Sequence, residues 1–467
     1  MLFYTCIDES RINPVRLALS TTTFNNERYI LSNIELIRDA IAAEGDPIAS
    51  SFHMFVVDNG RTLDVDALSD SVVTVIPNPN VGGSGGFARG MMAATENPGA
   101  FTHVLLMDDI VRILPESIFR TFNLLSLAQG RYRTVFINGA MLSLEDPTRQ
   151  FEDAAFVKER GIYSRCKEDL RIDRLADMLV NEHTSVEVPH AYGAWWCSCI
   201  PVAAIENNGL PLPLFIRCDD VEFGVRNQPT YMTMGGICVW HASFEGRFRA
   251  SVDCYQHVRN FLIAIAVDEA ASERMFIKRI DRDVSQLLRD MDYVSAERTL
   301  DGFADYLKGP DYIAHADGSK LMKENGAKNE KTVPLADLGP ELLRRAGVTK
   351  ELVEAGHSVI SPGFFTKLAR VLLPYDKHWL PDFMLNDTPG HMIKHGLIIV
   401  EGTSLRRRTM VCLEPTCKRA AVRTMDRARW RAIRTRQKEL MRIYRAQGDE
   451  VRQAYRDAMP RLISRAF

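Results

Sequence analysis

Short apolar runs alternate with amphipathic stretches along the first third of the chain. A short run of mostly apolar residues predicts a buried strand, whereas apolar residues spaced three or four apart predict a helix. The predicted strands cover residues 15–20, 52–57, 72–76 and 102–107. The predicted helices cover residues 26–43, 86–95 and 115–127. Alternation of this kind predicts an α/β domain with a mostly parallel sheet.

The pattern becomes mostly helical after residue 268. Residues 272–306 predict two helices, and residues 308–334 predict a polar connection. Helical patterning returns near 335–346 and 362–373, and again from about 417 to 459. The expected segments are a lead-in at 1–14, an α/β domain at 15–268, a helical domain at 269–405 and a basic helical tail at 406–467.

Polar clusters follow three of the predicted strands, at residues 21–25, 58–60 and 108–109. Ligands of parallel α/β sheets bind beyond the carboxyl ends of the strands. Asp108 and Asp109 are adjacent carboxylates, which repel each other unless a cation or donor lies between them. They therefore favour a divalent metal, Mg²⁺ or Mn²⁺, that holds a diphosphate. Acids that cap the following turn are the simpler alternative.

A glycine-rich segment, residues 80–89, follows a predicted strand and opens a helix. It fits a loose dinucleotide fingerprint, with Asp108 and Asp109 about 20 residues further on. A dinucleotide-dependent oxidoreductase is therefore one alternative. That fingerprint normally follows the first strand of its unit, however, and here two strand-like segments come earlier. A tight turn without a ligand is a further alternative.

A second acid pair, Asp219 and Asp220, follows the apolar residues 212–216. Carboxylates are costly next to a hydrophobic stretch unless they have a task. One of them is a candidate general base. The alternative is that Asp219 caps a helix.

Trp195 and Trp196 are adjacent, so in a strand one would face the core and the other a cleft. An exposed tryptophan face suits the C–H surfaces of sugars, and a purely structural role is the alternative. His241 follows another strand-like stretch, residues 236–239. In a chain with two acid pairs, a histidine at a strand end is a candidate metal ligand.

Composition narrows the class of protein. Hydrophobic residues make up 46% and charged residues 25% of 467, which excludes a disordered, collagen-like or small disulfide-stapled chain. Nine cysteines without a CxxC pair predict reduced thiols in the cytoplasm. No apolar run approaches the roughly 18 residues that a membrane span needs.

Charge is unevenly distributed. Residues 406–467 hold 18 basic and 6 acidic residues, a balance of +12, which leaves −14 for the rest of a chain whose net charge is −2. The tail either packs on the acidic body or binds anionic lipid, at roughly 1 kcal/mol per basic residue. It has little aromatic interleaving, so nucleic acid is not a predicted partner. The predicted location is the cytoplasm, peripheral on the inner face of the cell membrane.

Six segments occur in an order and spacing that are more specific than any one of them. They are residues 79–89, 107–109, 192–196, 213–226, 239–241 and 255–260. Together they resemble family 2 glycosyltransferases of the GT-A fold, over about residues 15–265. More narrowly, they resemble the bacterial galactofuranosyltransferases of galactan synthesis. The resemblance implies a Rossmann-like nucleotide-sugar-binding domain at 15–268.

The resemblance also implies roles for individual residues. Those implied for the UDP-sugar donor are Thr23, Phe24, Asn25, Asp58, Asn80, Gly82, Gly83, Arg89 and Asp108. Those implied for the metal are Asp108, Asp109 and His241, and those for the acceptor are Trp195 and Trp196. Asp220 would deprotonate an acceptor hydroxyl, with Asp219 beside it. The implied reaction is inverting transfer from UDP-galactofuranose to a lipid-linked or polysaccharide acceptor.

The sequence departs from the family pattern in two places. Ile110 stands where the pattern has a third, metal-binding aspartate. Only residues 1–14 precede the first predicted strand, where relatives carry a β-rich domain. A catalytically impaired relative that binds nucleotide sugar or glycan in an assembly is therefore the second hypothesis. Self-association into a homo-oligomer is left open.

Overall fold

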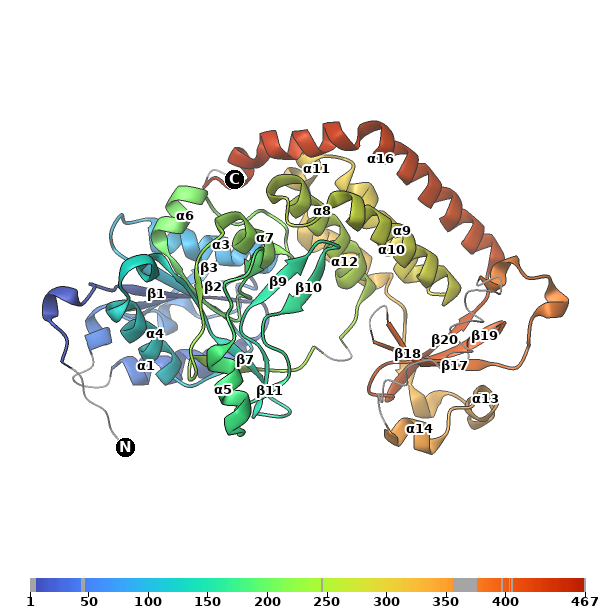
Figure 1. Cartoon of the computed structure of the whole chain (residues 1–467), viewed down its shortest axis with the longest axis horizontal. Coiled ribbons are helices and arrows are strands. Elements are labelled where there is room, and N and C mark those ends of the chain that lie inside the picture. The colour runs from blue at the N-terminus through green and yellow to red at the C-terminus, as the bar shows by residue number, and fades with distance from the viewer. Residues whose placement is uncertain are drawn as a thin grey trace.

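The computed structural model describes residues 6–42, 47–244, 247–355, 376–395, 398–402, 404 and 406–465. An α/β part lies at one end, a smaller sheet at the other, and helices lie between them (Figure 1). The predicted class, an α/β domain with a mostly parallel sheet followed by a helical region, is confirmed. The helix expected at 362–373 lies outside the described residues.

The main sheet has seven strands in the order β14-β6-β13-β4-β1-β2-β3. Their bounds are β1 Leu17–Thr23, β2 Phe52–Asp58, β3 Val73–Pro77, β4 His103–Asp108, β6 Phe136–Asn138, β13 Cys197–Pro201 and β14 Tyr231–Met232. β1 is parallel to β2 and β4, and β13 is antiparallel to both of its neighbours. All four predicted strands form, each within three residues of its expected bounds.

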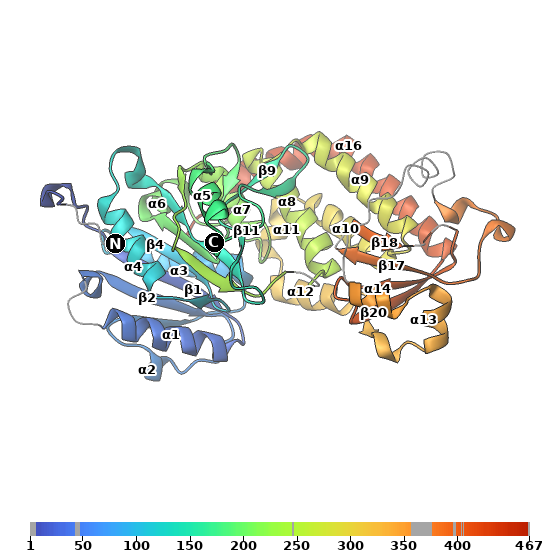
Figure 2. The same ribbon diagram turned by 60° about the horizontal axis from the view of Figure 1, so that its bottom comes forward.

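Helices cover both faces of this sheet. One face carries α1 (Glu27–Ile41) and α4 (Glu116–Leu127), and Figure 2 shows α1 below β1 and β2. The other face carries α3 (Gly82–Thr95), α6 (Val202–Asn208) and α7 (Asp219–Asn227). The apolar stripe of α1 is buried as its spacing predicts, because residues three or four apart share one helix face.

The glycines of α3 let this helix lie unusually close to β1. A Cβ atom on Gly86 would collide with the side chain of Thr22, and one on Gly90 with that of Ser20. The helix also begins at Gly82, four residues before the predicted start. Much of the glycine-rich segment is therefore a helical packing surface rather than a loop.

Two smaller sheets complete the α/β part, in the orders β11-β8-β7-β15-β5 and β10-β9-β12. Their strands are β5 Arg112–Ile113, β7 Ala140–Ser143, β8 Arg149–Glu152, β9 Ala155–Lys158, β10 Ile162–Arg165, β11 Leu170–Arg171, β12 Ala191–Tyr192 and β15 Cys238–His241. In the chain, the helix α5 (Leu175–His183) lies between β11 and β12, and the short helix α2 (Val65–Leu68) lies between β2 and β3 of the main sheet.

The helical region follows a π-helix, η4 (Ala250–Gln256). Its helices are α8 His257–Asp268, α9 Glu273–Arg289, α10 Tyr293–Tyr306, α11 Pro310–His315 and α12 Gly318–Ala327. The two helices predicted for 272–306 are confirmed. The polar connection predicted for 308–334 instead contains α11 and α12, because Pro310 suits a first helical turn and Asp317 caps the next helix.

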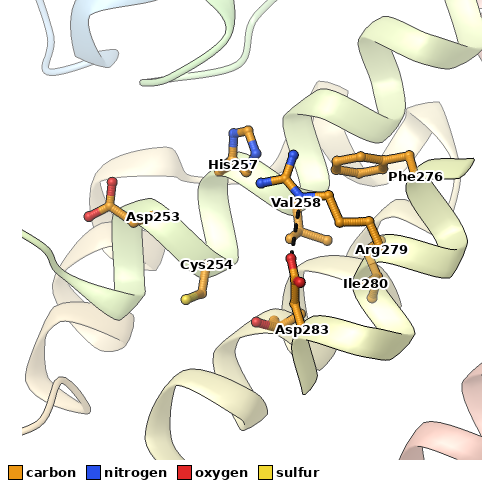
Figure 3. Close-up of a pocket in the computed structure, with 9 residues that line it drawn as sticks. Asp253, Cys254, His257, Val258, Phe276, Arg279, Ile280 and Asp283 are labelled. Atoms are coloured by element: carbon orange, nitrogen blue, oxygen red, sulfur yellow. Dashed lines mark hydrogen bonds and ion pairs between the residues drawn. The ribbon is translucent and has the colours of Figure 1, made fainter. Parts of the chain in front are cut away.

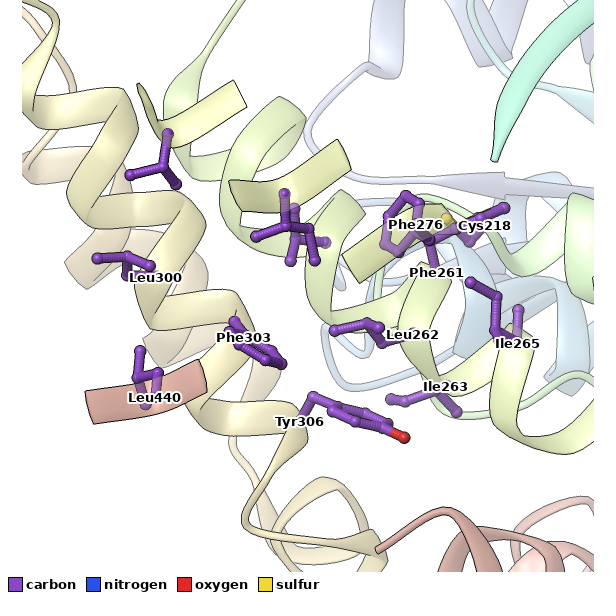
Figure 4. Packing of buried hydrophobic residues seen from close by; sticks show 14 of the residues in the cluster. Cys218, Phe261, Leu262, Ile263, Ile265, Phe276, Leu300, Phe303, Tyr306 and Leu440 are labelled. Atoms are coloured by element: carbon purple, nitrogen blue, oxygen red, sulfur yellow. The ribbon is translucent and has the colours of Figure 1, made fainter. Parts of the chain in front are cut away.

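One hydrophobic cluster joins α7, α8, α9, α10 and the C-terminal helix α16 (Arg427–Leu462), as Figure 4 illustrates around Phe261, Phe303 and Leu440. This cluster crosses residue 268, so the α/β part and the helices share a core. The proposed domain boundaries stay predictions.

The second end of the molecule holds a sheet in the order β16-β20-β19-β17-β18. Its strands are β16 Val333–Pro334, β17 Gly390–His395, β18 Ile398–Gly402, β19 Thr409–Leu413 and β20 Arg419–Thr424, with α13 Pro340–Ala346 and α14 Lys350–Ala355. The prediction of helix from about residue 417 is wrong up to Thr424, because β20 pairs with β19. Asp426 caps α16 and fixes its start at Arg427. Short 3-10 turns cover Glu9–Arg11, Pro47–Ser50, Gly130–Thr134, Leu335–Asp337, Lys377–Trp379 and Asp382–Met384.

α16 spans 36 residues and runs from the second sheet back to the α/β part (Figure 1). At its start, Trp430 Nε1 donates to Asp376 Oδ2 at 2.9 Å. At its end, the backbone N–H of Leu210 donates to Ile463 at 2.9 Å, and Arg465 donates to the Thr95 carbonyl. In the part of the chain that the structure describes, no helix is both long and apolar enough to cross a bilayer.

Candidate active site

The polar clusters predicted at three strand ends meet at one edge of the main sheet. Thr23 lies opposite Asp58 in the β1–β2 register, and Thr22 lies opposite Asp108 in the β1–β4 register. Parallel strands bring their carboxyl ends to the same edge, which is where such sheets bind ligands.

Asp58 shapes the turn after β2. Its side chain is 1% exposed, and its two carboxylate oxygens accept hydrogen bonds from three backbone N–H groups of residues 60–63 at 2.7 to 2.9 Å. The neighbouring Asn59 amide donates to the Gly82 carbonyl at 2.9 Å. The turn is therefore tied to the start of α3, and the predicted contact of Asp58 with a uracil stays a prediction.

Phe24 and Asn25 leave β1 beside this turn. Asn25 has a φ of 54°, and its Oδ1 atom would lie 2.7 Å from a Cβ atom on Gly60. Phe24 is exposed, so its ring is open to a flat ligand. Aromatic rings of this kind stack on nucleobases.

The first turn of α3 faces the second acid pair. The Asn80 side chain accepts from Gly82 N–H at 3.2 Å and contacts Ser319 at 3.4 Å. A Cβ atom on Gly83 would meet only Asp219 Oδ2, at 3.8 Å. Helix N-termini favour anionic groups, so this turn suits a phosphate that lies next to Asp219.

Arg89 lies apart from the other predicted donor residues. Its guanidinium pairs with Glu96 at 2.8 Å, just beyond the C-terminal end of α3. The opposite end of that helix faces the sheet edge. The structure therefore directs Arg89 away from the site, and its donor contact stays a prediction.

Asp108 and His241 lie together although they come from different sheets. His241 Nε2 lies 3.6 Å from Asp108 Oδ2, and Nδ1 lies 2.7 Å from the Ala242 carbonyl. A carbonyl only accepts, so Nδ1 carries a proton and donates it to Ala242, which directs Nε2 toward the carboxylate of Asp108. Phe244 stacks on the imidazole at 5.0 Å.

Asp109 is buried beside this pair. Burial and the charge of Asp108 raise the pKa of Asp109 to about 7. Burial also opposes ionisation of Asp108, but hydrogen bonds from His241 and Asp109 outweigh it and lower the pKa of Asp108. The two carboxyls therefore share a proton near neutral pH. Asn26 donates to Asp109 Oδ2 at 3.0 Å.

The donor set fits a divalent cation only in part. Asp108 and His241 supply an oxygen and a nitrogen ligand, and Ile110 supplies none. Among the described residues, no group of three or more His, Cys, Asp or Glu side chains is arranged to hold a metal. A cation here would need oxygen ligands from a bound diphosphate and water to complete its shell.

Asp219 and Asp220 begin α7 after a strained turn. Phe215, Arg217 and Cys218 all have φ between 68° and 73°. Burial and the charge of Asp220 raise the pKa of Asp219 to about 7. Burial raises the pKa of Asp220 to about 6. A carboxyl with a pKa near neutrality is suited to proton transfer, and backbone strain of this kind clusters at functional sites.

The two adjacent tryptophans lie in different surroundings. Trp195 is 6% exposed and packs edge-on against Phe87 and Phe223. Trp196 lies 6.3 Å from Phe244, near His241, and its Nε1 atom has no hydrogen-bond partner among the described residues. The structure gives Trp195 a packing role, whereas Trp196 is half-buried, with its Nε1 atom inside, and only the open part of its ring is available for the predicted acceptor contact.

Several residues that matter to the site were missed by sequence reasoning. Asn33 donates to the carbonyls of Asp109 and Val111, and its position on the apolar stripe of α1 was a usable signal. Asn260 ends the motif at 255–260, which carried no assigned role. Glu152 is 7% exposed and close enough to Asp220 to feel its charge, and no sequence signal marked it.

No family model matches the chain. Solved structures similar to it include the mannosyltransferase PcManGT from Pyrobaculum calidifontis in complex with GDP-Man and Mn²⁺, at 12% identity and a TM-score of 0.34 over 79% of this chain and 84% of that one. They also include GalNAc-T7 with UDP, GalNAc and Mn²⁺, at 11% identity and a TM-score of 0.37 over 55% and 49%.

The curated relatives share more sequence identity with the chain than these solved structures do. The chain is 26% identical over 428 residues to galactofuranosyltransferase GlfT2 of Mycobacterium tuberculosis, which covers 85% of this chain and 63% of that protein. It is 29% identical over 252 residues to the GlfT2 of Mycolicibacterium smegmatis, over 50% and 38%. The chain thus spans less than two thirds of the length of the curated relatives that it matches.

Proposed function

We propose that this protein is an inverting GT-A glycosyltransferase that moves galactofuranose from UDP-galactofuranose to a hydroxyl of a growing cell-surface polysaccharide. The donor would bind at the edge formed by Thr23, Asp58 and Asp108. The similarity to two galactofuranosyltransferases supports the donor sugar.

One observation carries the proposal: the first turn of α3 lies between the end of β2 and the acid pair Asp219–Asp220. Asn59 ties this turn to the end of β2, and Gly83 opens it toward Asp219. A diphosphate held at the helix N-terminus would thus place its sugar next to a carboxyl of raised pKa. That is the arrangement that a displacement at the anomeric carbon needs.

Asp220 would act as the general base. Its carboxylate takes the proton of the acceptor hydroxyl, the hydroxyl oxygen bonds to the anomeric carbon, and the bond from that carbon to the diphosphate breaks. UDP departs from the opposite face, so the configuration inverts. Asp219 would lie beside the diphosphate, and Trp196 would contact the acceptor with the open part of its ring.

A divalent cation bound by Asp108 and His241 would neutralise charge on the departing diphosphate. The backbone hydrogen bond of His241 Nδ1 supports this role, because metal-binding histidines are commonly oriented through their other nitrogen. Asp109 would support Asp108 by holding the shared proton.

The proposal is tested by measuring UDP release with UDP-galactofuranose, UDP-galactopyranose and UDP-glucose, each with and without Mn²⁺. We expect release that depends on an acceptor and is fastest with UDP-galactofuranose. No release with any donor, in a protein that binds UDP, would contradict the enzymatic proposal.

The second candidate is a relative that binds nucleotide sugar without transferring it. Ile110 and the incomplete ligand set favour it. It predicts UDP binding with little effect of Mn²⁺ on affinity and no turnover. The retained pair of Asp219 and Asp220 favours the enzyme.

We further propose that α16 attaches the protein to an anionic membrane. Many of its cations instead pair with the body, as Arg429 does with Glu297 and Arg436 with Asp301, so packing accounts for part of the basic charge. The remaining exposed cations lie on one face of the helix. They are Arg431, Lys438, Arg442 and Arg445, and within the described residues none of them forms an ion pair.

A further inference from the structure

The backbone that leads into the second acid pair is held in an unfavourable conformation. Phe215, Arg217 and Cys218 have φ values of 72°, 73° and 68°, a region in which side chains other than glycine are disfavoured. Such a turn persists only where its surroundings hold it. The residues that hold it therefore also set where Asp219 and Asp220 point.

Asn260, in α8, contacts this turn from behind. Its Nδ2 atom lies 3.1 Å from the carbonyl oxygen of Leu214, 2.8 Å from that of Ile216 and 2.9 Å from that of Arg217. Its Oδ1 atom accepts from Arg259 Nε at 2.9 Å, which fixes the amide orientation. Asn260 is 0% exposed, so these carbonyls have no access to water from its side.

Arg259 reinforces the same contact. It is 2% exposed, and its guanidinium donates to the Leu214 carbonyl at 3.1 Å and to Gln256 Oε1 at 2.6 Å. Its NH1 group reaches Tyr255, whose hydroxyl donates to Asp305 at 2.6 Å. A buried cation is costly unless every donor is used. Here the donors are used to connect the turn to α10.

The opposite side of the turn contacts the start of α3. The backbone N–H of Ser84 donates to the Phe215 carbonyl at 3.2 Å, and Gly82 leaves room for that carbonyl. The turn is therefore held between the proposed donor site in front and α8 behind. A change at Asn260 would act on the acids without touching the donor.

A small cavity lies near this support. A cavity of about 30 Å³ lies among η4, α8 and α9, lined by Asp253, His257 and Arg279 among others (Figure 3). That volume suits about one water molecule. Arg217 pairs with Asp253 at its edge. This cavity is therefore too small for a substrate.

We propose that Asn260 is a positioning residue, which holds residues 214–217 in their left-handed turn and thereby orients the Asp219–Asp220 pair toward the acceptor. This inference rests on the proposed function of the acid pair. It assigns the motif at 255–260 to the support of the proposed base.

The test compares Asn260→Ala and the milder Asn260→Ser, which keeps one donor, with the unsubstituted protein. We expect kcat for sugar transfer to fall at least tenfold in Asn260→Ala and less in Asn260→Ser. The dissociation constant for UDP, measured by calorimetry, should change less than threefold. The acidic limb of the kcat–pH profile should move to lower pH, because a loosened turn exposes the base to water.

A second substitution separates conformational support from general stability. Glycine adopts a left-handed φ without penalty. Adding Arg217→Gly to Asn260→Ala should therefore raise kcat at least threefold above that of Asn260→Ala. Arg217→Ala also removes the ion pair to Asp253, but alanine keeps the penalty of a left-handed φ. Adding it to Asn260→Ala should therefore leave kcat unchanged.

Normal kcat and an unchanged pH profile in both Asn260 variants would overturn the inference, as would equal recovery with Arg217→Gly and Arg217→Ala. Absence of turnover in the unsubstituted protein would instead count against the proposed function. The two failures are therefore distinguishable.

Discussion

His241 Nε2 lies 3.6 Å from Asp108 Oδ2 while the other ring nitrogen is held by a backbone carbonyl. The contact joins the main sheet to the smaller sheet that contains β15, and it places a carboxylate oxygen and an imidazole nitrogen where both could bind one cation. The same edge holds Asp109, so three groups that sequence analysis placed in one metal site do lie together, although they do not form a complete ligand set.

Asp220→Asn should lower kcat for transfer by about 10²–10⁴-fold, the range for loss of a general base. UDP affinity should stay within twofold, because the substitution leaves the start of α3 unchanged. Since the base acts deprotonated and burial raises its pKa to about 6, the rate of the unsubstituted protein should rise with pH through about 6. Transfer at the unsubstituted rate in Asp220→Asn would refute the assignment.

Ile110→Asp should lower the Mn²⁺ concentration for half-maximal transfer. The new carboxylate adds a hard ligand two residues from Asp108, where the family pattern places one. Ile110→Asn is the matched control, since the asparagine side chain has nearly the size and polarity of aspartate but carries no charge. A folded aspartate variant, judged by its melting temperature, with the same Mn²⁺ requirement as the control would argue that position 110 is not the missing ligand.

Gly90→Ala should destabilise the protein by about 1–3 kcal/mol, because its new methyl group would overlap the Ser20 side chain. Gly83→Ala lies in the same helix but meets only Asp219 Oδ2, at 3.8 Å. It should keep the melting temperature and lower transfer by narrowing the gap to the acid pair. Denaturant unfolding and UDP release are measured on both variants. The same loss of stability and of transfer in Gly90→Ala and Gly83→Ala would contradict the prediction.

Glu152→Gln should stabilise the protein in a manner that depends on pH. Burial, with the charges of Asp220 and Asp153, raises the pKa of Glu152 to about 8 against the opposing charge of Arg165. A carboxyl with a raised folded-state pKa contributes its stability at low pH and loses it as pH rises from about 4.5 toward 8. The variant should therefore melt at the same temperature as the unsubstituted protein near pH 4 and higher at pH 8. An equal difference at both pH values would exclude this cause.

Replacing Arg431, Lys438, Arg442 and Arg445 by glutamine should reduce sedimentation with vesicles of anionic lipid at low salt. Raised salt should reduce binding of the unsubstituted protein in the same way. The control replaces four cations that pair with the body, Arg429, Arg436, Arg452 and Arg456, and removes the same charge. It should lower the melting temperature and affect vesicle binding less. Equal loss of binding in the two variants would indicate a response to net charge alone.

The sequence predicted four of the seven strands of the main sheet, because the signal for each of them is local, but it did not predict β6, β13 or β14. Each strand of the pattern at 15–107 is a short apolar run, and the polar residues that follow Thr22 or Met107 mark the carboxyl edge. Parallel topology then brings these ends together without further information. The site residues predicted at those ends therefore came out adjacent.

Features that depend on residues far away in the chain were harder to predict from the sequence. The segment at 419–424 has helical-looking neighbours, but pairing with β19 makes it a strand. The helix predicted from residue 86 begins at Gly82, and its close packing through Gly86 and Gly90 depends on Thr22 and Ser20, more than 60 residues earlier in the chain. Likewise Trp195 is buried by Phe87 and Phe223, which lie more than 25 residues away in the chain.

The 36 residues of α16 amount to about 54 Å of continuous helix at 1.5 Å per residue. Its first turns contact Asp376, and its last residues are hydrogen-bonded to Leu210 and Thr95. A rod anchored at both ends acts mechanically as a strut, because neither compression nor extension is possible without breaking one anchor. The distance between the main sheet and the sheet that contains β17 should therefore stay constant, and any closure over a bound ligand must come from loops at the edge of the main sheet.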